Sequence, residues 1–504
     1  MVKYPLWEAL SQHFQEKNDQ IALVIAGRPY SYSQIHHWSQ AIRIALQAQK
    51  TSGPFVAIVT HNHPLTYAAI WALWQEGKAY VPLSPLYPSA RKVQILQQAH
   101  ISTLCSCKAE ASDITGYSEI LDLNQVVQNG SAAFPGQPLW PDAEAPVCML
   151  FTSGSTGVPK GVPYTLRNAA CTLDAFFALN LGLHSGDRFL QAFELTFDMS
   201  MLSFLPAWCL GASVWTVSSS SLKYLDIYRV LHKGAITFAA LVPSTLALLR
   251  PNVAEIHLPA LRCMMVGGEP FPLDLAMDWL AALPNARLLN ISGPCETTMA
   301  CMAYEVHRDP KKNKTHKGVL AFGKPWKNTT ALLVNEQQEE VQEGEEGELC
   351  FAGEHVMSGY WGQADLNRSI FFEKEINGRQ QRFYRTGDRA FCDASGDYYT
   401  CGRLDHQYKI QGFKVELGEI EHLARKVLAS RQAIAVVKQQ AAGQEIHLFA
   451  EGASGMLERL KQQLAEALPP YMMPAAITMV DQWPYNTSGK IDRQALLQLC
   501  QPDS

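Results

Sequence analysis

The sequence lacks several features that would point to particular functional classes. Its 42 lysines and arginines against 47 aspartates and glutamates give a net charge of −5, so there is no excess of positive charge for binding nucleic acid. No apolar run approaches the roughly 18 residues that span a bilayer, and the N-terminus leads into a polar stretch rather than a signal core. We therefore expect a cytoplasmic protein that binds neither nucleic acid nor a membrane.

The 12 cysteines also lack any paired spacing. Cys105 and Cys107 are too close together for a zinc pair, and no Cys-x-x-Cys motif finds a partner elsewhere in the chain. We expect buried, reduced thiols rather than disulfides or a zinc centre.

The order of apolar segments predicts the architecture. A chain of 504 residues exceeds what one hydrophobic core usually supports. Up to about residue 400, helices alternate with short apolar strands, for example 66–75 with 79–82, and further strands are expected at 238–242 and 263–266. This alternation predicts an α/β fold with largely parallel sheets. After residue 405 the order helix, strand, strand, helix predicts a small α+β domain, so we expect a large domain of residues 1–404 and a second of residues 405–504.

Residues 150–161 read LFTSGSTGVPKG and follow an apolar run. Glycines allow the backbone to approach an anion, hydroxyl groups donate to phosphate oxygens, and Lys160 adds a positive charge. The segment is not a Walker-type loop, because Pro159 precedes the lysine and Gly161 follows it. A flexible linker is the alternative, but the Pro-Lys-Gly end between strand-like segments favours a phosphate-binding loop.

With downstream motifs, this loop resembles the adenylate-forming (ANL) superfamily, which includes nonribosomal peptide synthetase adenylation domains, D-alanine–D-alanyl carrier protein ligases, acyl-CoA synthetases and luciferases. The resemblance covers nearly the whole chain, and the motifs occur in the family's order. They are 197–200 (FDMS), 292–297 (SGPCET), 347–349 (GEL), 359–361 (GYW), 384–388 (YRTGD), 402–405 (GRLD), 409–412 (KIQG) and 486–492 (NTSGKID).

The resemblance implies ATP and Mg²⁺ as cofactors. Glu296 matches the family's Mg²⁺-coordinating glutamate, Asp388 the aspartate that accepts the ribose hydroxyls, and Arg403 an arginine that reaches the nucleotide. Taken alone, Asp388 and Arg403 would more often be surface residues in an ion pair. The other nucleotide-binding positions that carry over are Thr152, Ser153, Gly154, Ser155, Thr156, Gly157, Lys160, Gly268, Ser292, Gly293, Pro294 and Cys295.

Two lysines and a hinge also carry over from the family. Lys490 matches the catalytic lysine of adenylation, whose flexible ammonium can bridge the substrate carboxylate and the ribose–phosphate region. Lys409 matches a lysine on the opposite face of the small domain, which implies a role in thioester formation. The family's small domain rotates about the residue that corresponds to Asp405, so the resemblance implies a mobile C-terminal domain.

The class of substrate depends on Asp198, which matches the aspartate that binds the substrate ammonium in amino-acid-activating members. A fatty or aryl acid would leave this aspartate without a charged partner, so an amino acid is favoured. The rest of the pocket implied by the resemblance is apolar or small, which suits alanine, proline or valine. Its residues are Met199, Leu202, Ala240, Met265, Gly267, Ile291, Met299 and Ala300.

Three positions depart from the family's patterns. Ser292 replaces the usual aromatic residue against adenine, which removes about 0.5–1.5 kcal/mol of stacking. Cys295 stands where the family usually has a threonine near the α-phosphate. The D-alanyl ligase branch has a bulkier residue in place of Gly267, so the chirality of the substrate stays open.

These observations predict a free-standing AMP-forming ligase. It would convert a small apolar amino acid and ATP to aminoacyl-AMP and pyrophosphate, then load the aminoacyl group onto the phosphopantetheine thiol of a separate carrier protein. Two alternatives stay open. An acyl-CoA synthetase would share the motifs without an ammonium-binding role for Asp198, and a catalytically degenerate binding module would account for Ser292 and Cys295.

Overall fold

The computed structural model divides into two compact units. The first comprises residues 1–85, 98–150 and 161–404, and the second comprises residues 86–97, 151–160 and 405–504. Each unit contains a hydrophobic core of its own. The structure describes residues 5–15, 18–49, 51, 53–107, 114, 119–129, 135–154, 158–217, 223–404, 407–428, 432–440, 443–451, 454–480, 482–485 and 491–500.

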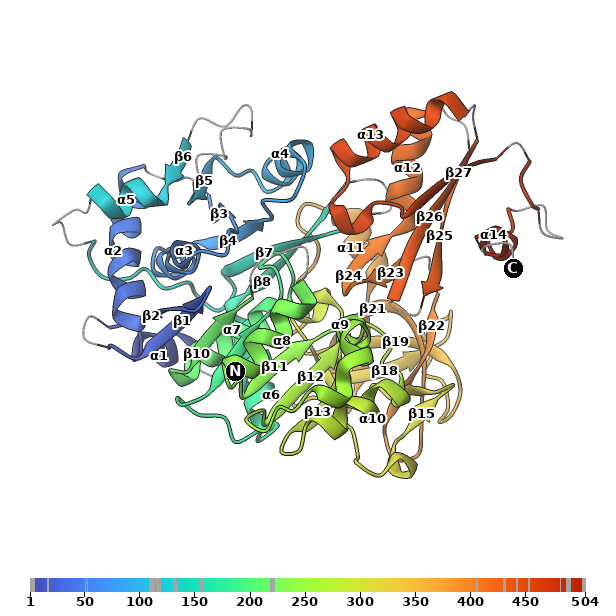
Figure 1. The fold of residues 1–504 in the computed structure, drawn as a ribbon, viewed down its shortest axis with the longest axis horizontal. Coiled ribbons are helices and arrows are strands. Elements are labelled where there is room, and N and C mark those ends of the chain that lie inside the picture. The colour runs from blue at the N-terminus through green and yellow to red at the C-terminus, as the bar shows by residue number, and fades with distance from the viewer. Residues whose placement is uncertain are drawn as a thin grey trace. The chain divides into compact units, whose positions relative to one another are not determined.

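The largest sheet described in the first unit has nine strands, and its green strands run side by side in Figure 1. Six neighbouring strands, from β13 to β1 in the order below, are parallel, and antiparallel strands extend both edges. The strands expected at 238–242 and 263–266 are confirmed as β11 and β12. The order is β17 (Lys324–Pro325), β14 (Met302–Glu305), β13 (Arg287–Ser292), β12 (Cys263–Gly267), β11 (Phe238–Leu241), β9 (Arg188–Gln191), β10 (Ser213–Thr216), β1 (Ile21–Ile25) and β2 (Arg28–Ser31).

A second sheet of six strands contains the apolar pair expected at 66–75 and 79–82, which is confirmed as α3 (Pro64–Gln75) and β4. Every residue of α3 is buried, as expected for a helix that has no polar face. Helix α3 starts at Pro64, where the missing amide costs nothing, and the His63 ring accepts a hydrogen bond from the Leu65 amide. The strand order is β6 (Glu119–Asp122), β5 (Thr103–Ser106), β3 (Phe55–Val59), β4 (Ala79–Leu83), β7 (Pro146–Thr152) and β8 (Lys160–Thr165).

The expectation of largely parallel sheets is wrong for residues 330–403, which form a five-stranded antiparallel sheet. The connections from β20 to β21 and from β21 to β22 are too short for parallel crossovers. Asn377 and Gly378, with φ of 52° and 74°, form the two-residue connection between β20 and β21. The strands are β18 (Thr330–Val334), β19 (Gly347–Ala352), β20 (Phe371–Ile376), β21 (Arg379–Cys392) and β22 (Tyr398–Arg403).

The remaining helices of the first unit are amphipathic or buried segments between these strands. Helix α2 begins with a capping box, in which Ser31 and Gln34 each accept a hydrogen bond from the other's backbone amide. These helices are α1 (Leu6–Ser11), α2 (Tyr32–Ala48), α5 (Leu123–Asn129), α6 (Leu166–Ala178), α7 (Met199–Leu210), α8 (Lys223–Lys233), α9 (Pro243–Leu249), α10 (Leu273–Ala282) and α11 (Ala364–Ile370).

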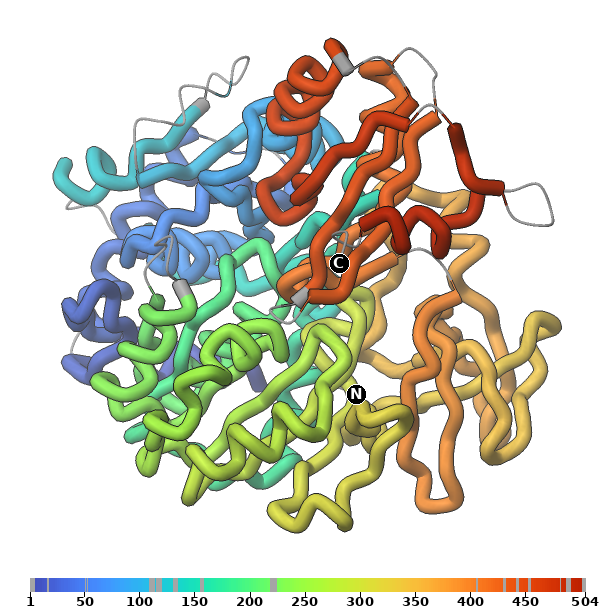
Figure 2. Tube along the Cα trace, turned by 45° about the vertical axis from the view of Figure 1, so that its right-hand side comes forward, coloured from blue at the N-terminus to red at the C-terminus, as the bar shows by residue number. Residues whose placement is uncertain are grey.

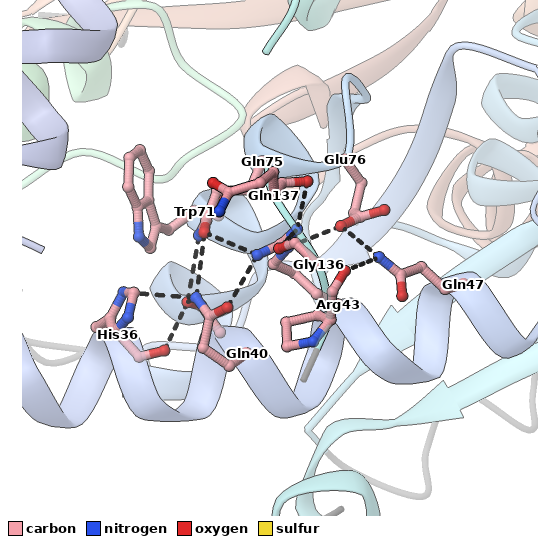
Figure 3. Close-up of polar contacts among 11 residues, drawn as sticks. His36, Gln40, Arg43, Gln47, Trp71, Gln75, Glu76, Gly136 and Gln137 are labelled. Carbon is pink, nitrogen blue, oxygen red and sulfur yellow. Dashed lines mark hydrogen bonds and ion pairs between the residues drawn. The ribbon is translucent and has the colours of Figure 1, made fainter. Parts of the chain in front are cut away.

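A buried guanidinium joins α2 to α3 (Figure 3). Arg43 donates to Glu76 at 2.7 Å, to Gln40 at 2.9 Å and to the carbonyl oxygen of Gly136 at 3.1 Å. A buried charge is tolerated only when it is paired and hydrogen-bonded, and these contacts meet that need. We therefore assign this cluster to stability of the fold rather than to ligand binding.

The second unit follows the predicted order of helix, strand, strand, helix. Leu417, Ile420, Leu448 and Leu460 are among the buried side chains of its core. A hairpin precedes this order, and a third strand pairs parallel with β26, so that β25–β27 lie side by side (Figure 2). The elements are α4 (Ser89–Gln98), β23 (Gln407–Ile410), β24 (Phe413–Glu416), α12 (Leu417–Val427), β25 (Ala433–Gln440), β26 (Gly443–Glu451), α13 (Leu457–Ala467), β27 (Ala476–Val480) and α14 (Arg493–Leu499).

All 12 cysteines are free, as expected. The expectation of burial is wrong for four of them, which are only half-buried: Cys295, Cys392, Cys401 and Cys500. Within the described ranges, no helix has both the length and the apolar character needed to cross a membrane.

Candidate active site

Glu296 lies in a short 3₁₀ helix, Cys295–Thr297, that follows β13. Its side chain is completely buried, and the Tyr360 hydroxyl donates a hydrogen bond to its Oε1 atom. Thr298 and Met299, which come next, have φ of 57° and 74°, in the left-handed region that side chains rarely adopt. Backbone strain of this kind is concentrated at functional sites, so the geometry singles out this turn.

Five of the expected nucleotide-binding residues lie where β12 and β13 end. These strands are parallel neighbours, with Gly267 opposite Ile291, so both end at the same edge of the sheet. In parallel sheets, ligands bind beyond the carboxyl ends of the strands. The five residues are Gly268, Ser292, Gly293, Pro294 and Cys295.

Asp388 and Arg403 face each other on the paired strands β21 and β22. An Arg403 nitrogen lies 2.7 Å from an Asp388 oxygen, and a second nitrogen donates to the Thr386 carbonyl oxygen at 2.9 Å. Their side chains are 20% and 24% exposed, so a ligand can reach them. Asp388 and Arg403 therefore form the ion pair that would be expected of such residues taken alone. Both side chains are also accessible to a nucleotide.

Asp198 caps the start of α7. Its Oδ1 atom accepts a hydrogen bond from the Met199 amide at 2.8 Å, and the residue is 8% exposed. The apolar residues expected around the substrate are all buried in the large core cluster that α7 also contributes to. They are Met199, Leu202, Ala240, Met265, Ile291, Met299 and Ala300.

Tyr164, which the sequence analysis did not identify, lies close to both candidate regions. Its hydroxyl donates to the Cys295 carbonyl oxygen at 2.7 Å and lies 3.1 Å from the Cys295 sulfur. Burial raises the pKa of Tyr164 well above its usual range, and the charge of Asp198 adds to the shift. The Tyr164 phenol therefore fixes the first residue of the Cys295–Thr297 turn.

Gly267 occupies a position with no room for a side chain. A Cβ atom there would lie 2.4 Å from the Ile291 carbonyl oxygen and 2.7 Å from the Ile291 Cγ1 atom. The bulkier residue of the D-alanyl ligase branch would require β13 to shift.

The loop expected to bind phosphate belongs to the second unit, where it already binds carboxylates. The Ser153 hydroxyl donates to the Lys414 carbonyl oxygen at 2.8 Å, and the Gly154 amide donates to a Glu419 oxygen at 3.1 Å. Lys160 lies 2.6 Å from an oxygen of Glu416. The Gly154 amide and the Lys160 ammonium thus both contact carboxylates, and the binding of phosphate by this loop stays a prediction.

The structure describes only some of the other site residues that were expected in the second unit. The Thr152 hydroxyl is buried and has no hydrogen-bond partner among the residues described. Lys409 lies on β23 opposite Lys414 and is half-buried. The expected residues Ser155, Thr156, Gly157, Asp405 and Lys490 lie outside the described residues.

The donor chemistry suits Mg²⁺ at Glu296. No group of three His, Cys, Asp or Glu side chains that could hold a metal occurs among the residues that the structure describes. Mg²⁺ is commonly held by one or two carboxylates together with phosphate oxygens and water, so such a group is not required. The single buried carboxylate of Glu296 fits that kind of site.

Comparison with known proteins extends these findings. The chain is 28% identical to the D-alanine–D-alanyl carrier protein ligase of Bacillus licheniformis, over 97% of this chain and 98% of that protein. It is 29% identical to tyrocidine synthase 1 of Brevibacillus parabrevis, over 98% of this chain but only 45% of that longer protein.

Among solved structures, NpsA-ThdA, an artificially fused adenylation–PCP di-domain NRPS from Klebsiella oxytoca, superposes with a TM-score of 0.84 at 25% identity. The match covers 95% of this chain and 94% of that one. The expected α/β fold is thereby confirmed. The model of the AMP-binding enzyme family matches residues 10–361, so this chain belongs to the AMP-binding enzyme family.

Proposed function

We propose that this protein is an AMP-forming ligase that activates a small apolar amino acid with ATP. The substrate carboxylate attacks the α-phosphorus of ATP, the bond to pyrophosphate breaks, and aminoacyl-AMP forms. The aminoacyl group then passes to the phosphopantetheine thiol of a carrier protein, which releases AMP. We also propose a cytoplasmic location, because the reaction uses ATP.

One observation carries the choice of an amino acid. Asp198 is a nearly buried carboxylate at the start of a helix whose next residues enter an apolar core. A substrate ammonium carries the charge that a buried carboxylate pairs with favourably, whereas a fatty or aryl acid offers no such group. The apolar residues nearby offer no group for a polar side chain, so a compact aliphatic substrate fits best.

The nucleotide would be held by the remaining residues. Asp388 would accept the ribose hydroxyls, Arg403 would reach the phosphates, and the amides and Lys160 of the loop would exchange their carboxylate partners for phosphate oxygens. Glu296 would hold Mg²⁺, which would supply positive charge against the phosphates. Tyr164 would hold the turn at Cys295 in place through its hydrogen bond to the Cys295 carbonyl oxygen.

The relatives support transfer to a carrier protein. The Bacillus protein, which matches along nearly its whole length, is by name a ligase of D-alanine and a carrier protein. In our proposal Lys490 stabilises the adenylation transition state and Lys409 serves thioester formation. Asp405 is the hinge between domains of residues 1–404 and 405–504.

ATP–pyrophosphate exchange tests the proposal. The panel would contain both alanine enantiomers, L-proline, L-valine and glycine, together with fatty and aryl acids. We expect exchange with one small aliphatic amino acid and none with the other acids. Exchange with fatty or aryl acids alone would instead identify an acyl-CoA synthetase, and no exchange at all would favour the degenerate binding module.

A further inference from the structure

A short segment, residues 357–361, makes contact with Glu296 at two points. The Met357 amide donates to the Glu296 carbonyl oxygen at 2.9 Å, and the Tyr360 hydroxyl donates to the Glu296 Oε1 atom. The next residue, Trp361, donates its amide to the Gly161 carbonyl oxygen at 2.8 Å. The segment therefore links the Glu296 turn to the residue that follows Lys160 in the sequence.

The backbone of Tyr360 is fixed by one side chain of α11. Asn367 accepts a hydrogen bond from the Tyr360 amide at 2.8 Å and donates to the Tyr360 carbonyl oxygen at 2.9 Å. Gly359 has a φ of 146°, and a Cβ atom there would lie 2.7 Å from the Asn367 amide nitrogen. Glycine at 359 is what allows the Asn367 amide to approach this closely.

The Tyr360 hydroxyl donates to the Glu296 carboxylate from a buried position. The residue is 5% exposed, so little water can compete for this hydrogen bond. Hydrogen bonds to a charged group are about twice as strong as neutral ones, and a donor fixed on one oxygen sets the rotation of the carboxylate plane.

We propose that Tyr360 is a positioning residue that holds the Glu296 carboxylate in the orientation needed to bind Mg²⁺, and that Asn367 fixes Tyr360 for this task. The inference rests on the proposed role of Glu296 and adds two residues that do not touch the metal themselves. Residues that orient a metal ligand typically contribute a factor of about 10–100 to metal affinity.

The test is the affinity for ATP measured by calorimetry, once with excess Mg²⁺ and once with EDTA. It requires neither turnover nor knowledge of the amino acid. We expect Tyr360→Phe to weaken binding of Mg·ATP about 10–100-fold while leaving binding of metal-free ATP unchanged. Asn367→Ala, which keeps the phenol, should change affinity in the same direction by a smaller factor.

Two reference variants make the outcome specific. Tyr32→Phe removes another buried phenol, which donates to the Ala212 carbonyl oxygen, and should leave both affinities unchanged. Glu296→Gln should remove the effect of Mg²⁺, and adding Tyr360→Phe to it should change nothing further, because the two act as one unit.

Equal weakening with and without Mg²⁺ in Tyr360→Phe would overturn the positioning role, as would full retention of the Mg²⁺ effect. If Tyr360→Phe does not fold, the same comparison in Asn367→Ala decides. If Glu296→Gln keeps the full Mg²⁺ effect, the proposed role of Glu296 fails, whatever Tyr360→Phe does. Failure to activate an amino acid would leave this test intact.

Discussion

Two buried carboxylates of the first unit, Asp198 and Glu296, are held in different ways. Asp198 accepts a hydrogen bond from the amide of the very next residue, at the start of α7. Glu296 is held by the hydroxyl of Tyr360, which lies 64 residues further along the chain. The first arrangement depends on local sequence, whereas the second exists only when distant segments have folded together.

This difference between Asp198 and Glu296 predicts how each site responds to substitution. An asparagine can replace Asp198 as a helix cap, because both side chains accept hydrogen bonds from amides. The charge can thus be removed with little effect on the fold. At Glu296, orientation and charge both depend on neighbours, so substitutions at several positions should alter the same function.

The largest effect is expected from Glu296→Gln. Loss of the carboxylate charge removes the proposed Mg²⁺ ligand, and we expect substrate-dependent ATP–pyrophosphate exchange to fall about 10²–10³-fold. Glu339→Gln, in an exposed turn, is the matched control and should leave exchange unchanged. Exchange by Glu296→Gln at the wild-type rate would mean that Glu296 is structural and that the comparison with Asp198 has no bearing on function.

The free energy of unfolding should depend on pH through a buried histidine close to the Glu296 turn. His355, whose carbonyl oxygen accepts a hydrogen bond from Thr298 at 2.7 Å, is 2% exposed, and burial lowers its pKa from 6.5 to about 4. Above pH 6.5 the imidazole is neutral in both the folded and unfolded states. As the pH falls from there to about 4, the unfolded chain gains the proton first, so stability is lost by at most about 3 kcal/mol.

His355→Gln should therefore flatten the dependence of the unfolding free energy on pH over that interval, as measured by urea titration. His184→Gln, whose side chain is 65% exposed, is the control and should keep the wild-type slope. An unchanged slope in His355→Gln would show that His355 is not the group responsible.

A smaller loss of stability is expected from Gly267→Ala, beside the apolar residues of the Asp198 region. Its Cβ atom would lie 2.4 Å from the Ile291 carbonyl oxygen, so we expect the unfolding free energy to fall by about 1–3 kcal/mol. Gly455→Ala, where no atom lies within 4 Å of the added Cβ, should cost little. Equal stability of the two variants in chemical denaturation would contradict the tight approach of β12 to β13.

The smallest change in stability is expected at the half-buried pair of Arg403 with Asp388. Arg403→Gln should cost no more than about 1 kcal/mol in unfolding free energy, since ion pairs that water reaches contribute little. Its affinity for AMP should nevertheless fall about tenfold, because a charge-assisted hydrogen bond is lost. Arg229→Gln, which removes the ion pair of Arg229 with Asp226, is the control for both measurements. Unchanged AMP affinity would leave Arg403 as a surface residue only.

The contrast between local and long-range contacts also explains which features could be predicted from the sequence. Periodicity predicted α3, α12 and the strands β4, β11 and β12, because these depend on apolar patterns within single segments. The motif order predicted the family, and the helix-start position of Asp198 is a local feature. The role of Tyr360 could not be predicted, although its motif was noted, because its partner Glu296 is distant in the chain. The antiparallel sheet was not predicted either, because the alternation of helices and strands favoured parallel sheets. The Asn377–Gly378 pair, which is typical of a hairpin turn, is the signal that indicates it.

The account's central claim is that Asp198 binds the ammonium of an amino acid. The most direct measurement compares ATP–pyrophosphate exchange of the wild type, Asp198→Asn and the matched cap control Asp309→Asn, with the active amino acid as substrate. Asp309 also caps a short exposed helix, where its side chain accepts a hydrogen bond from the Lys311 amide. We predict that Asp198→Asn lowers the rate of exchange at least about 100-fold, because the substrate ammonium then lacks its charged partner, at a cost of several kcal/mol. The melting temperature of Asp198→Asn should stay at the wild-type value. Asp309→Asn should keep the wild-type rate of exchange. Wild-type exchange by Asp198→Asn would contradict the claim.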